Sequence, residues 1–129
     1  MVTGMAFSPD STKLAIAQTD NIVFVYRLGL EWGDKKTVAN RFQTDSSVTT
    51  VCWPSGRPND VVFGLADGVV VAGHSKSGGR APPTTALYNG GAFTLSTCPS
   101  PDGLGFLSGH SDGCIYRFHF GDGTAGPVH

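Results

Sequence analysis

Three consecutive residues, His110-Ser111-Asp112, bring together the side-chain types that hydrolases use as base, nucleophile and orienting acid. Catalytic triads are assembled in space from separated elements, whereas neighbours on a strand project to opposite faces. The chain also lacks a Gly-x-Ser-x-Gly turn, which would expose a serine nucleophile. We therefore expect no catalytic site here and interpret Asp112 as a turn residue.

The other residues suited to chemistry are potential metal ligands. These are His74, His110, His119, His129, Cys52, Cys98 and Cys114. No two of them have the short sequence spacing that is typical of a zinc site. Three cysteines without a Cys-x-x-Cys fit neither a disulfide framework nor a zinc knuckle, which indicates a reducing compartment. We expect no metal and no other cofactor, and we interpret the cysteines as small buried residues.

A polar segment at residues 28–36 is the strongest candidate for contact with a partner. It contains Trp32, and strand pairing does not explain a tryptophan in this setting. Tryptophan is enriched in interface hot spots because it offers a large apolar area. Two interpretations stay open: the indole folds back over Leu28, Leu30 or the strand edge, or it anchors a partner protein. The candidate protein-binding residues are Leu30, Glu31, Trp32, Asp34, Lys35 and Lys36.

Composition limits the classes of function. The chain has 129 residues, enough for one domain, and its 9 Lys and Arg against 10 Asp and Glu give a net charge of −1. That balance argues against nucleic acid or an anionic membrane as partner. No apolar stretch is long enough to span a membrane, and the first residues do not resemble a leader peptide. The 18 glycines and 8 prolines lie between short apolar runs, which predicts many turns joining short strands.

A pattern of strands and turns recurs about every 46 residues. Strand-like runs at 2–7, 48–53 and 93–98 are each followed by a Pro-containing turn, a second strand and a tight turn. The tight turns contain Asp20, Asp67 and Asp112, 47 and 45 residues apart, whose carboxylates we expect to bind turn backbone. Third strands follow at 22–26, 69–72 and 114–118, and fourth strands at 37–42 and 84–88.

The repeats divide the chain. We expect a partial propeller over residues 1–120, with repeats at 1–47, 48–91 and 92–120, and a flexible tail over 121–129. We expect no fourth strand in the third repeat, because a segment that contains Gly121, Gly123 and Pro127 has the composition of a disordered chain end.

Four antiparallel strands per repeat, with an Asp turn before the third, are typical of a β-propeller blade. The order of the Ser-Pro-Asp and Asp-Gly turns resembles the WD40 family, although the third strands end in Tyr26-Arg27, Gly73-His74 and Phe118-His119 instead of Trp-Asp. The predicted fold is therefore all-β: an incomplete WD40-type ring of about three four-stranded antiparallel blades. Propellers need four to eight blades, so the chain is expected to be a segment of a longer propeller or to complete a ring by self-association.

A closer resemblance rests on residues 5–33, on Val62-Phe63-Gly64-Leu65-Ala66-Asp67-Gly68 and on Leu107-Ser108-Gly109-His110. These segments resemble the N-terminal propeller of the intraflagellar transport protein family, in a large peripheral subunit of ciliary transport complex B. The resemblance implies a non-catalytic scaffold with protein partners of that complex, in the cilium or flagellum and basal body and otherwise in the cytoplasm. The alternatives are a WD40 interaction module of another cytosolic complex and, in another class, a small propeller enzyme formed by oligomerisation.

Overall fold

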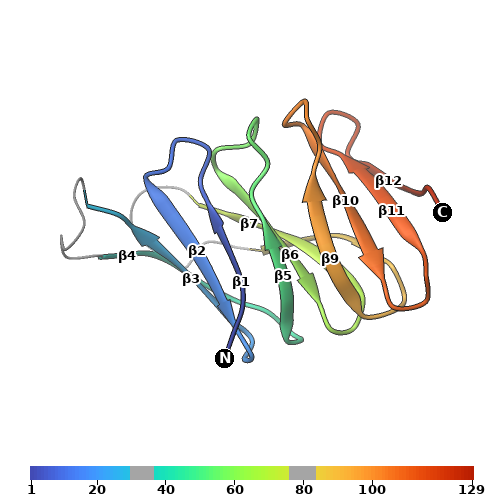
Figure 1. Ribbon diagram of the computed structural model, residues 1–129, viewed down its shortest axis with the longest axis horizontal. Helices are drawn as coiled ribbons and strands as arrows, with labels where there is room; N and C mark the ends of the chain where they lie inside the picture. The colour runs from blue at the N-terminus through green and yellow to red at the C-terminus, as the bar shows by residue number, and fades with distance from the viewer. Residues whose placement is uncertain (30–36, 76–83) are drawn as a thin grey trace.

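The computed structural model describes residues 1–29, 37–75 and 84–129. These residues form three four-stranded antiparallel sheets, called blades here, and no helix (Figure 1). Blade 1 consists of β1 (Val2–Phe7), β2 (Lys13–Gln18), β3 (Ile22–Arg27) and β4 (Thr37–Gln43). Blade 2 consists of β5 (Val48–Cys52), β6 (Asp60–Leu65), β7 (Val69–His74) and β8 (Thr84–Asn89). Blade 3 consists of β9 (Thr94–Pro99), β10 (Gly105–His110), β11 (Ile115–His119) and β12 (Thr124–Pro127).

The blades stand side by side in chain order as an open arc, so the predicted fold is confirmed (Figure 1). Within each blade the strands pair in sequence order, and the first strands β1, β5 and β9 lie next to one another. Threonine hydroxyls join these first strands: Thr3 donates to the Val48 carbonyl at 3.1 Å, and Thr49 donates to the Thr94 carbonyl at 2.5 Å. Both threonines occupy a bulge, which turns the hydroxyl toward the next blade.

The two faces of a blade differ because strand side chains alternate between them. In blade 1 one face carries Ala15, Ala17, Val23 and Val25, and we call this register the small face of a blade. The opposite register we call the large face, and in blade 2 it carries Trp53, Val61, Phe63 and Val71. The small face of blade 1 packs on the large face of blade 2 to form the main core, where Phe42 and Phe63 meet with ring centroids 5.4 Å apart.

The second seam repeats this arrangement with different residues. Cys52, Val62 and Val70 on the small face of blade 2 pack on Phe106 and Phe118 of blade 3. Further rings close the seam, since Tyr88 stacks on both phenylalanines with centroids 6.1 and 6.0 Å away. Each seam therefore joins the small face of one blade to the large face of the next.

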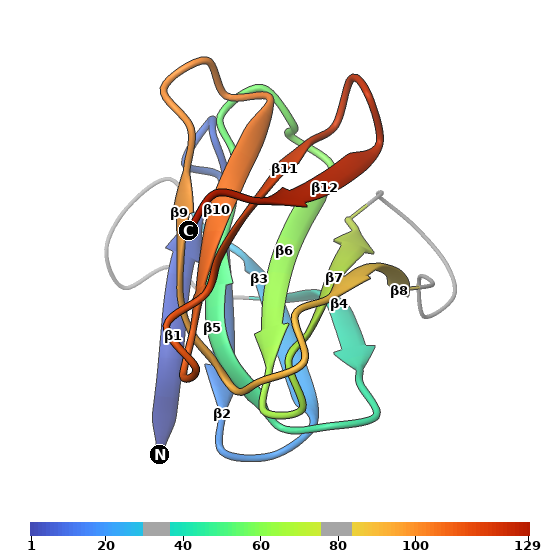
Figure 2. The same ribbon diagram turned by 90° about the vertical axis from the view of Figure 1, so that its right-hand side faces the viewer.

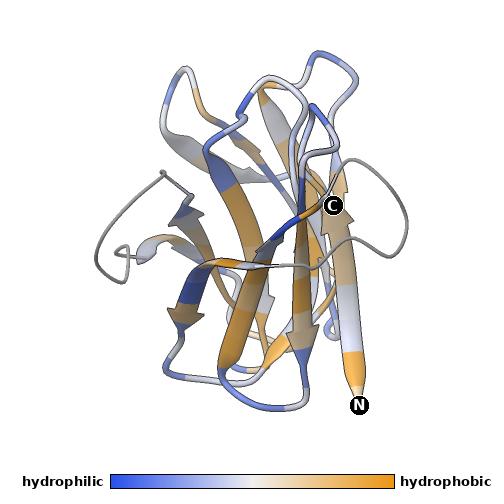
Figure 3. Ribbon diagram, turned by 90° about the vertical axis from the view of Figure 1, so that its left-hand side faces the viewer, coloured by the Kyte–Doolittle hydropathy of each residue, from blue (hydrophilic) through white to orange (hydrophobic). Residues whose placement is uncertain are grey.

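The arc leaves one face of each end blade without a neighbour among the described residues. On the large face of blade 1, Met5 is 62% exposed and Phe7 57% exposed, beside the pair Phe24 and Tyr26. Figure 3, in which this end of the arc faces the viewer, shows hydrophobic colour along its strands. Figure 2 looks at the opposite end, which blade 3 forms.

The C-terminal residues correct the sequence analysis. A flexible tail was predicted for 121–129, but β12 pairs with β11 from Tyr116↔Pro127 to His119↔Thr124 and gives blade 3 its fourth strand. Gly123 adopts a φ of +65°, which L-residues rarely adopt, and so closes the tight turn between the two strands. Composition alone does not reveal this strand, because glycine and proline also occur in short edge strands. Across the described ranges, no helix is long and apolar enough to cross a membrane.

Candidate functional site

The loops that could meet a partner lie together at one end of the strands, on the same side of all three blades, and we call this side the loop end (Figure 1). It carries the connections from first to second strands at 8–12, 53–59 and 100–104, and the turn 120–123 that follows the third strand of blade 3. The Asp turns lie at the opposite end. The predicted protein-binding residues Leu30, Glu31, Trp32, Asp34, Lys35 and Lys36 lie outside the described residues, within the connection from β3 to β4.

A buried carboxylate organises the loop end of blade 2. Asp60 is only 6% exposed and accepts hydrogen bonds on both oxygens. Its Oδ2 lies 2.8 Å from Arg57 Nε and 2.6 Å from Arg57 Nη2, and its Oδ1 lies 2.5 Å from His74 Nδ1. Buried carboxylates require such partners because desolvation of an unpaired charge is costly. The three side chains therefore form one preorganised group of mixed charge.

Arg57 also connects blade 2 to blade 3. Its guanidinium lies over the Phe120 ring, 4.5 Å from the centroid, and its carbonyl accepts a hydrogen bond from Trp53 Nε1 at 3.1 Å. In the same loop the Gly56 amide donates to the Gly103 carbonyl at 2.9 Å. These contacts join the loops of blades 2 and 3 to one another. Neither Arg57 nor Asp60 was predicted as a site residue from the sequence.

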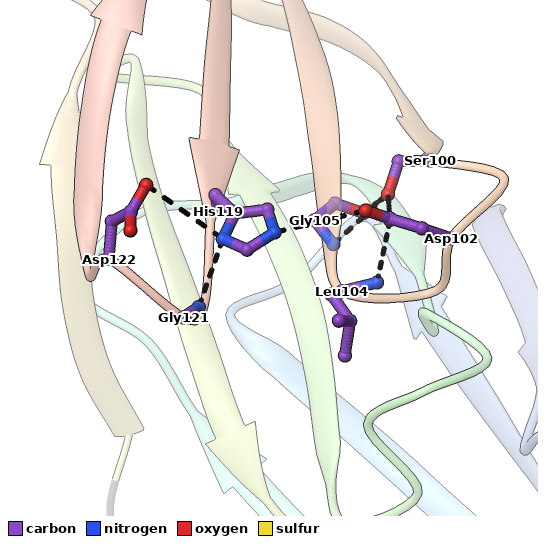
Figure 4. A network of polar contacts seen from close by, with 7 residues as sticks. All are labelled: Ser100, Asp102, Leu104, Gly105, His119, Gly121 and Asp122. Carbon is purple, nitrogen blue, oxygen red and sulfur yellow. Dashed lines mark hydrogen bonds and ion pairs between the residues drawn. The ribbon is translucent and has the colours of Figure 1, made fainter.

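The loop end of blade 3 carries a second polar group (Figure 4). His119 accepts a hydrogen bond from the Gly121 amide through Nδ1 at 3.2 Å, so its other nitrogen Nε2 carries the proton of the neutral ring. Nε2 lies 3.8 Å from Asp102 Oδ2, and Nδ1 lies 4.0 Å from Asp122 Oδ2. The pKa of Asp102 is lowered chiefly because its carboxylate accepts a hydrogen bond from the Ser100 hydroxyl at 2.5 Å.

The loop end of blade 3 is also hollowed. A cavity of about 330 Å³ is lined by residues of β9, β10 and β11, among them Cys98, Leu107 and Arg117. A second one of about 380 Å³ lies between β11 and β12 and again includes Arg117. Both open on the face of blade 3 that points away from blade 2.

The sequence His110-Ser111-Asp112 does not form a triad. His110 is 3% exposed, and its Nδ1 donates to the Ala92 carbonyl at 2.8 Å. Its Nε2 accepts from the Ser108 hydroxyl at 2.8 Å, and Ser108 in turn accepts from the Tyr88 hydroxyl at 2.7 Å. Burial raises the pKa of Tyr88 to about 12, so the phenol stays a donor at neutral pH. This chain of hydrogen bonds fixes the seam between blades 2 and 3.

The three turn aspartates act on their own backbone, as the repeat predicts. Asp20 accepts from the Ile22 amide at 3.1 Å, and Asp67 and Asp112 accept from the amides two residues further on at 3.0 Å. The pKa of Asp112 is lowered because its carboxylate accepts the Cys114 amide hydrogen bond. These residues position the hairpins and face away from the loop end.

The cysteines differ in burial, which corrects their uniform interpretation as buried residues. Cys52 is buried in the second seam, and that burial raises the pKa of its thiol to about 12. Cys114 is half-buried, and Cys98 is exposed because nothing described covers its face of blade 3. In the described ranges no three His, Cys, Asp or Glu side chains group as metal ligands.

An open arc of four-stranded antiparallel blades with its loops collected at one end defines a segment of a β-propeller. No protein family model matches the chain. It is, however, 45% identical over 126 residues to human intraflagellar transport protein 172 homolog, an alignment that covers 98% of the chain. It is 46% identical over 125 residues to intraflagellar transport protein 172 of Chlamydomonas reinhardtii, and 34% identical over 124 residues to intraflagellar transport protein osm-1 of Caenorhabditis elegans.

These similarities confirm the resemblance to intraflagellar transport proteins over nearly the whole chain and point to the cilium or flagellum. The chain spans about 7% of the length of these relatives.

Proposed function

We propose that the chain is a propeller segment of an intraflagellar transport subunit and acts as a non-catalytic scaffold that binds other protein subunits, those of ciliary transport complex B. The observation that carries this proposal is the 45% identity to an intraflagellar transport protein across 98% of the chain. Unrelated functions share the propeller fold, so the fold alone would not support it.

The loop end is the binding surface that the geometry favours. Strand pairing stiffens the blades, and the contacts of Arg57 with Asp60 and Phe120 hold adjacent loops in one arrangement. A rigid surface loses little conformational entropy on binding, which improves affinity. In the sequence Trp32 follows β3, and a tryptophan beside Glu31, Lys35 and Lys36 has the composition of an interface anchor with a charged rim.

The proposal is tested with Trp32→Ala in the protein at its natural length, isolated from ciliated cells with its partners. We expect recovery of transport subunits to fall about 10- to 30-fold, the loss typical of one hot-spot residue. The matched control is Phe93→Ala. Phe93 is a half-exposed aromatic residue just before β9, on the side of the blades opposite the loop end. Unchanged recovery with Trp32→Ala would remove Trp32 as an anchor, and absence of transport subunits from the wild-type sample would refute the scaffold itself.

A further inference from the structure

The charge of the loop end differs from blade to blade. Blade 1 carries the exposed carboxylate of Asp10 there, and blade 3 carries exposed aspartates on both of its loops. Blade 2 carries Arg57 and His74, and its carboxylate at this end, Asp60, is buried. Among the residues that the structure describes, blade 2 therefore presents basic side chains to a partner and no exposed carboxylate.

One buried carboxylate holds both basic side chains of blade 2. Arg57 contacts Oδ2 of Asp60, and His74 contacts Oδ1 of the same group. The side chain of Asp60 is 8% exposed, whereas those of Arg57 and His74 remain 39% and 47% exposed. The two side chains are thus fixed side by side at their inner atoms, and their outer atoms reach the solvent.

Both side chains keep a nitrogen that can bind an anion. Arg57 contacts Asp60 through Nε and Nη2, so Nη1 has no partner among the described residues. A carboxylate only accepts hydrogen bonds, so His74 donates to Asp60 through Nδ1. The remaining nitrogen Nε2 becomes a donor when the ring takes up a second proton. An acceptor from outside can therefore meet Arg57 Nη1 and His74 Nε2 together.

The net charge of this group matches a carboxylate. With His74 protonated, one negative charge on Asp60 offsets one of two positive charges, so a single positive charge remains. One Asp or Glu side chain neutralises it. A phosphate ester carries a charge of about −1.5 to −2 at neutral pH, which would leave excess negative charge near Asp60. The site therefore favours a carboxylate over a phosphate.

A further cation lies beside the group, across the seam with blade 1. Lys13 begins β2, and its Nζ donates to the hydroxyl of Ser75 at 3.4 Å. Ser75 directly follows His74 in the chain, so the ammonium group is close to the end of β7. Two positions for carboxylates, one on blade 2 and one at Lys13, fit a segment with several acidic residues better than a single acidic side chain.

We propose that the loop end of blade 2 binds an acidic segment of a partner protein, with one Asp or Glu carboxylate accepting hydrogen bonds from Arg57 and His74. A neighbouring acidic side chain of the segment lies toward Lys13. This inference rests on the proposed function, since it names the chemistry of the partner that the loop end receives. The bound carboxylate requires a proton on His74 Nε2, so binding takes up that proton and weakens as the pH rises from about 6 to about 8.

The surroundings of His74 contain few other groups that could titrate in this range. The charged residues on the described elements around it are Asp60, Arg57, Lys13 and, on the loops of blade 3, Asp102 and Asp122. Cys52 and Tyr88 in the adjoining seam stay neutral, because burial raises the pKa of each to about 12. We therefore assign the pH dependence to His74.

The test uses the protein at its natural length and a short peptide of alternating Glu and Gly that carries a photo-crosslinking group. At about pH 6 we expect this peptide to crosslink within residues 53–59, and a Gln and Gly peptide to give at least about fivefold less product. His74→Gln should lower the yield about fivefold and remove its decrease between about pH 6 and 8. The glutamine amide can still donate to Asp60, so this variant keeps the buried carboxylate paired.

Arg41→Gln is the matched control for the loss of a positive charge. Arg41 is exposed on β4 and pairs with Phe24 in the middle of β3, away from the loop end. Its crosslinking yield should equal that of the wild type. An unchanged yield in His74→Gln, equal yields with the Glu and Gln peptides, or no crosslink within 53–59 would overturn the proposal.

Two further outcomes separate this inference from its alternatives. A peptide with phosphoserine in place of Glu that crosslinks about tenfold better would overturn the carboxylate in favour of a phosphorylated partner. Recovery of transport subunits with the wild-type protein tests the proposed function independently. If the subunits are recovered and the Glu peptide does not crosslink, this inference alone is wrong. If the peptide crosslinks as expected and no subunits are recovered, the acidic site stands and the transport scaffold is refuted.

Discussion

Replacing Gly90 by Ala should disrupt the seam between blades 2 and 3. A Cβ added at Gly90 would lie 2.7 Å from both ring nitrogens of His110 and closer still to Cε1. Real Cβ atoms do not approach other atoms so closely, so the ring must move. The ring is held by hydrogen bonds to Ala92 and Ser108, and moving it would break at least one of them.

The expected cost follows from these contacts. Overpacking a core typically costs about 1–3 kcal/mol, and a broken buried hydrogen bond adds about 1 kcal/mol. We therefore expect Gly90→Ala to lower the free energy of unfolding by about 2–4 kcal/mol. Removing the ring with His110→Ala also destabilises, by about 2–4 kcal/mol, because it leaves a cavity and unpairs the Ser108 hydroxyl. In the double variant the new methyl group enters space that the ring has vacated. The destabilisation of the double variant should therefore be smaller, by about 1–3 kcal/mol, than the sum of the destabilisations of the two single variants.

Urea unfolding of the four proteins of this cycle, followed by tryptophan fluorescence, measures the coupling. Gly126→Ala is the control, since an added Cβ at Gly126 meets nothing within 4 Å; it should lie within about 0.5 kcal/mol of wild type. Additive costs, or a Gly90→Ala variant as stable as wild type, would refute the steric argument and with it the placement of His110.

Two further predictions concern the core and the acid limit of stability. Phe42→Ala should cost about 3–5 kcal/mol in urea unfolding because Phe42 is fully buried against Phe63, whereas Val38→Ala, at an exposed site of the same strand, should cost almost nothing. Hydrogen bonds, first from the Thr12 hydroxyl, lower the pKa of Asp10 to about 2 from 3.8, so its contribution to stability is present above about pH 4 and is lost as the pH falls toward 2. Asp10→Asn should therefore flatten the loss of stability between pH 4 and 2, and an unchanged acid profile would contradict this assignment.

The repeat predicted the elements that depend on local pattern. Asp20 and Asp67 identified the hairpins because an aspartate two residues before a strand can accept that strand's first amide. The position of a hairpin turn also predicts which residues pair across its two strands. Asp60 and His74 lie equidistant from Asp67 and pair across β6 and β7, so their pairing could have been predicted from the turn. Burial of Asp60 was not predictable, because it depends on Arg57 and the loops of two blades.

Features that depend on tertiary packing could not be predicted from the sequence. The ring of His110 turns toward Ala92 in the preceding connection, and no local spacing encodes that contact. Cys98 shares its register with Cys52, yet one thiol is exposed and the other buried. Blade 3 covers Cys52, whereas no described residue covers Cys98. The burial of each thiol therefore depends on the neighbouring blade and not on the residue itself.

The polarity of the seams determines how further blades can join. Each described seam presses a face of small residues, such as Ala15 or Cys52, against a face of large ones, such as Phe63 or Phe106. Two large faces would clash and two small faces would leave voids, and both cost stability in a close-packed interior. By the same rule, the exposed large face of blade 1, with Met5 62% exposed, is complementary only to a face of small residues. Blades of this kind can therefore stack in one orientation only, and this requirement gives the arc its direction.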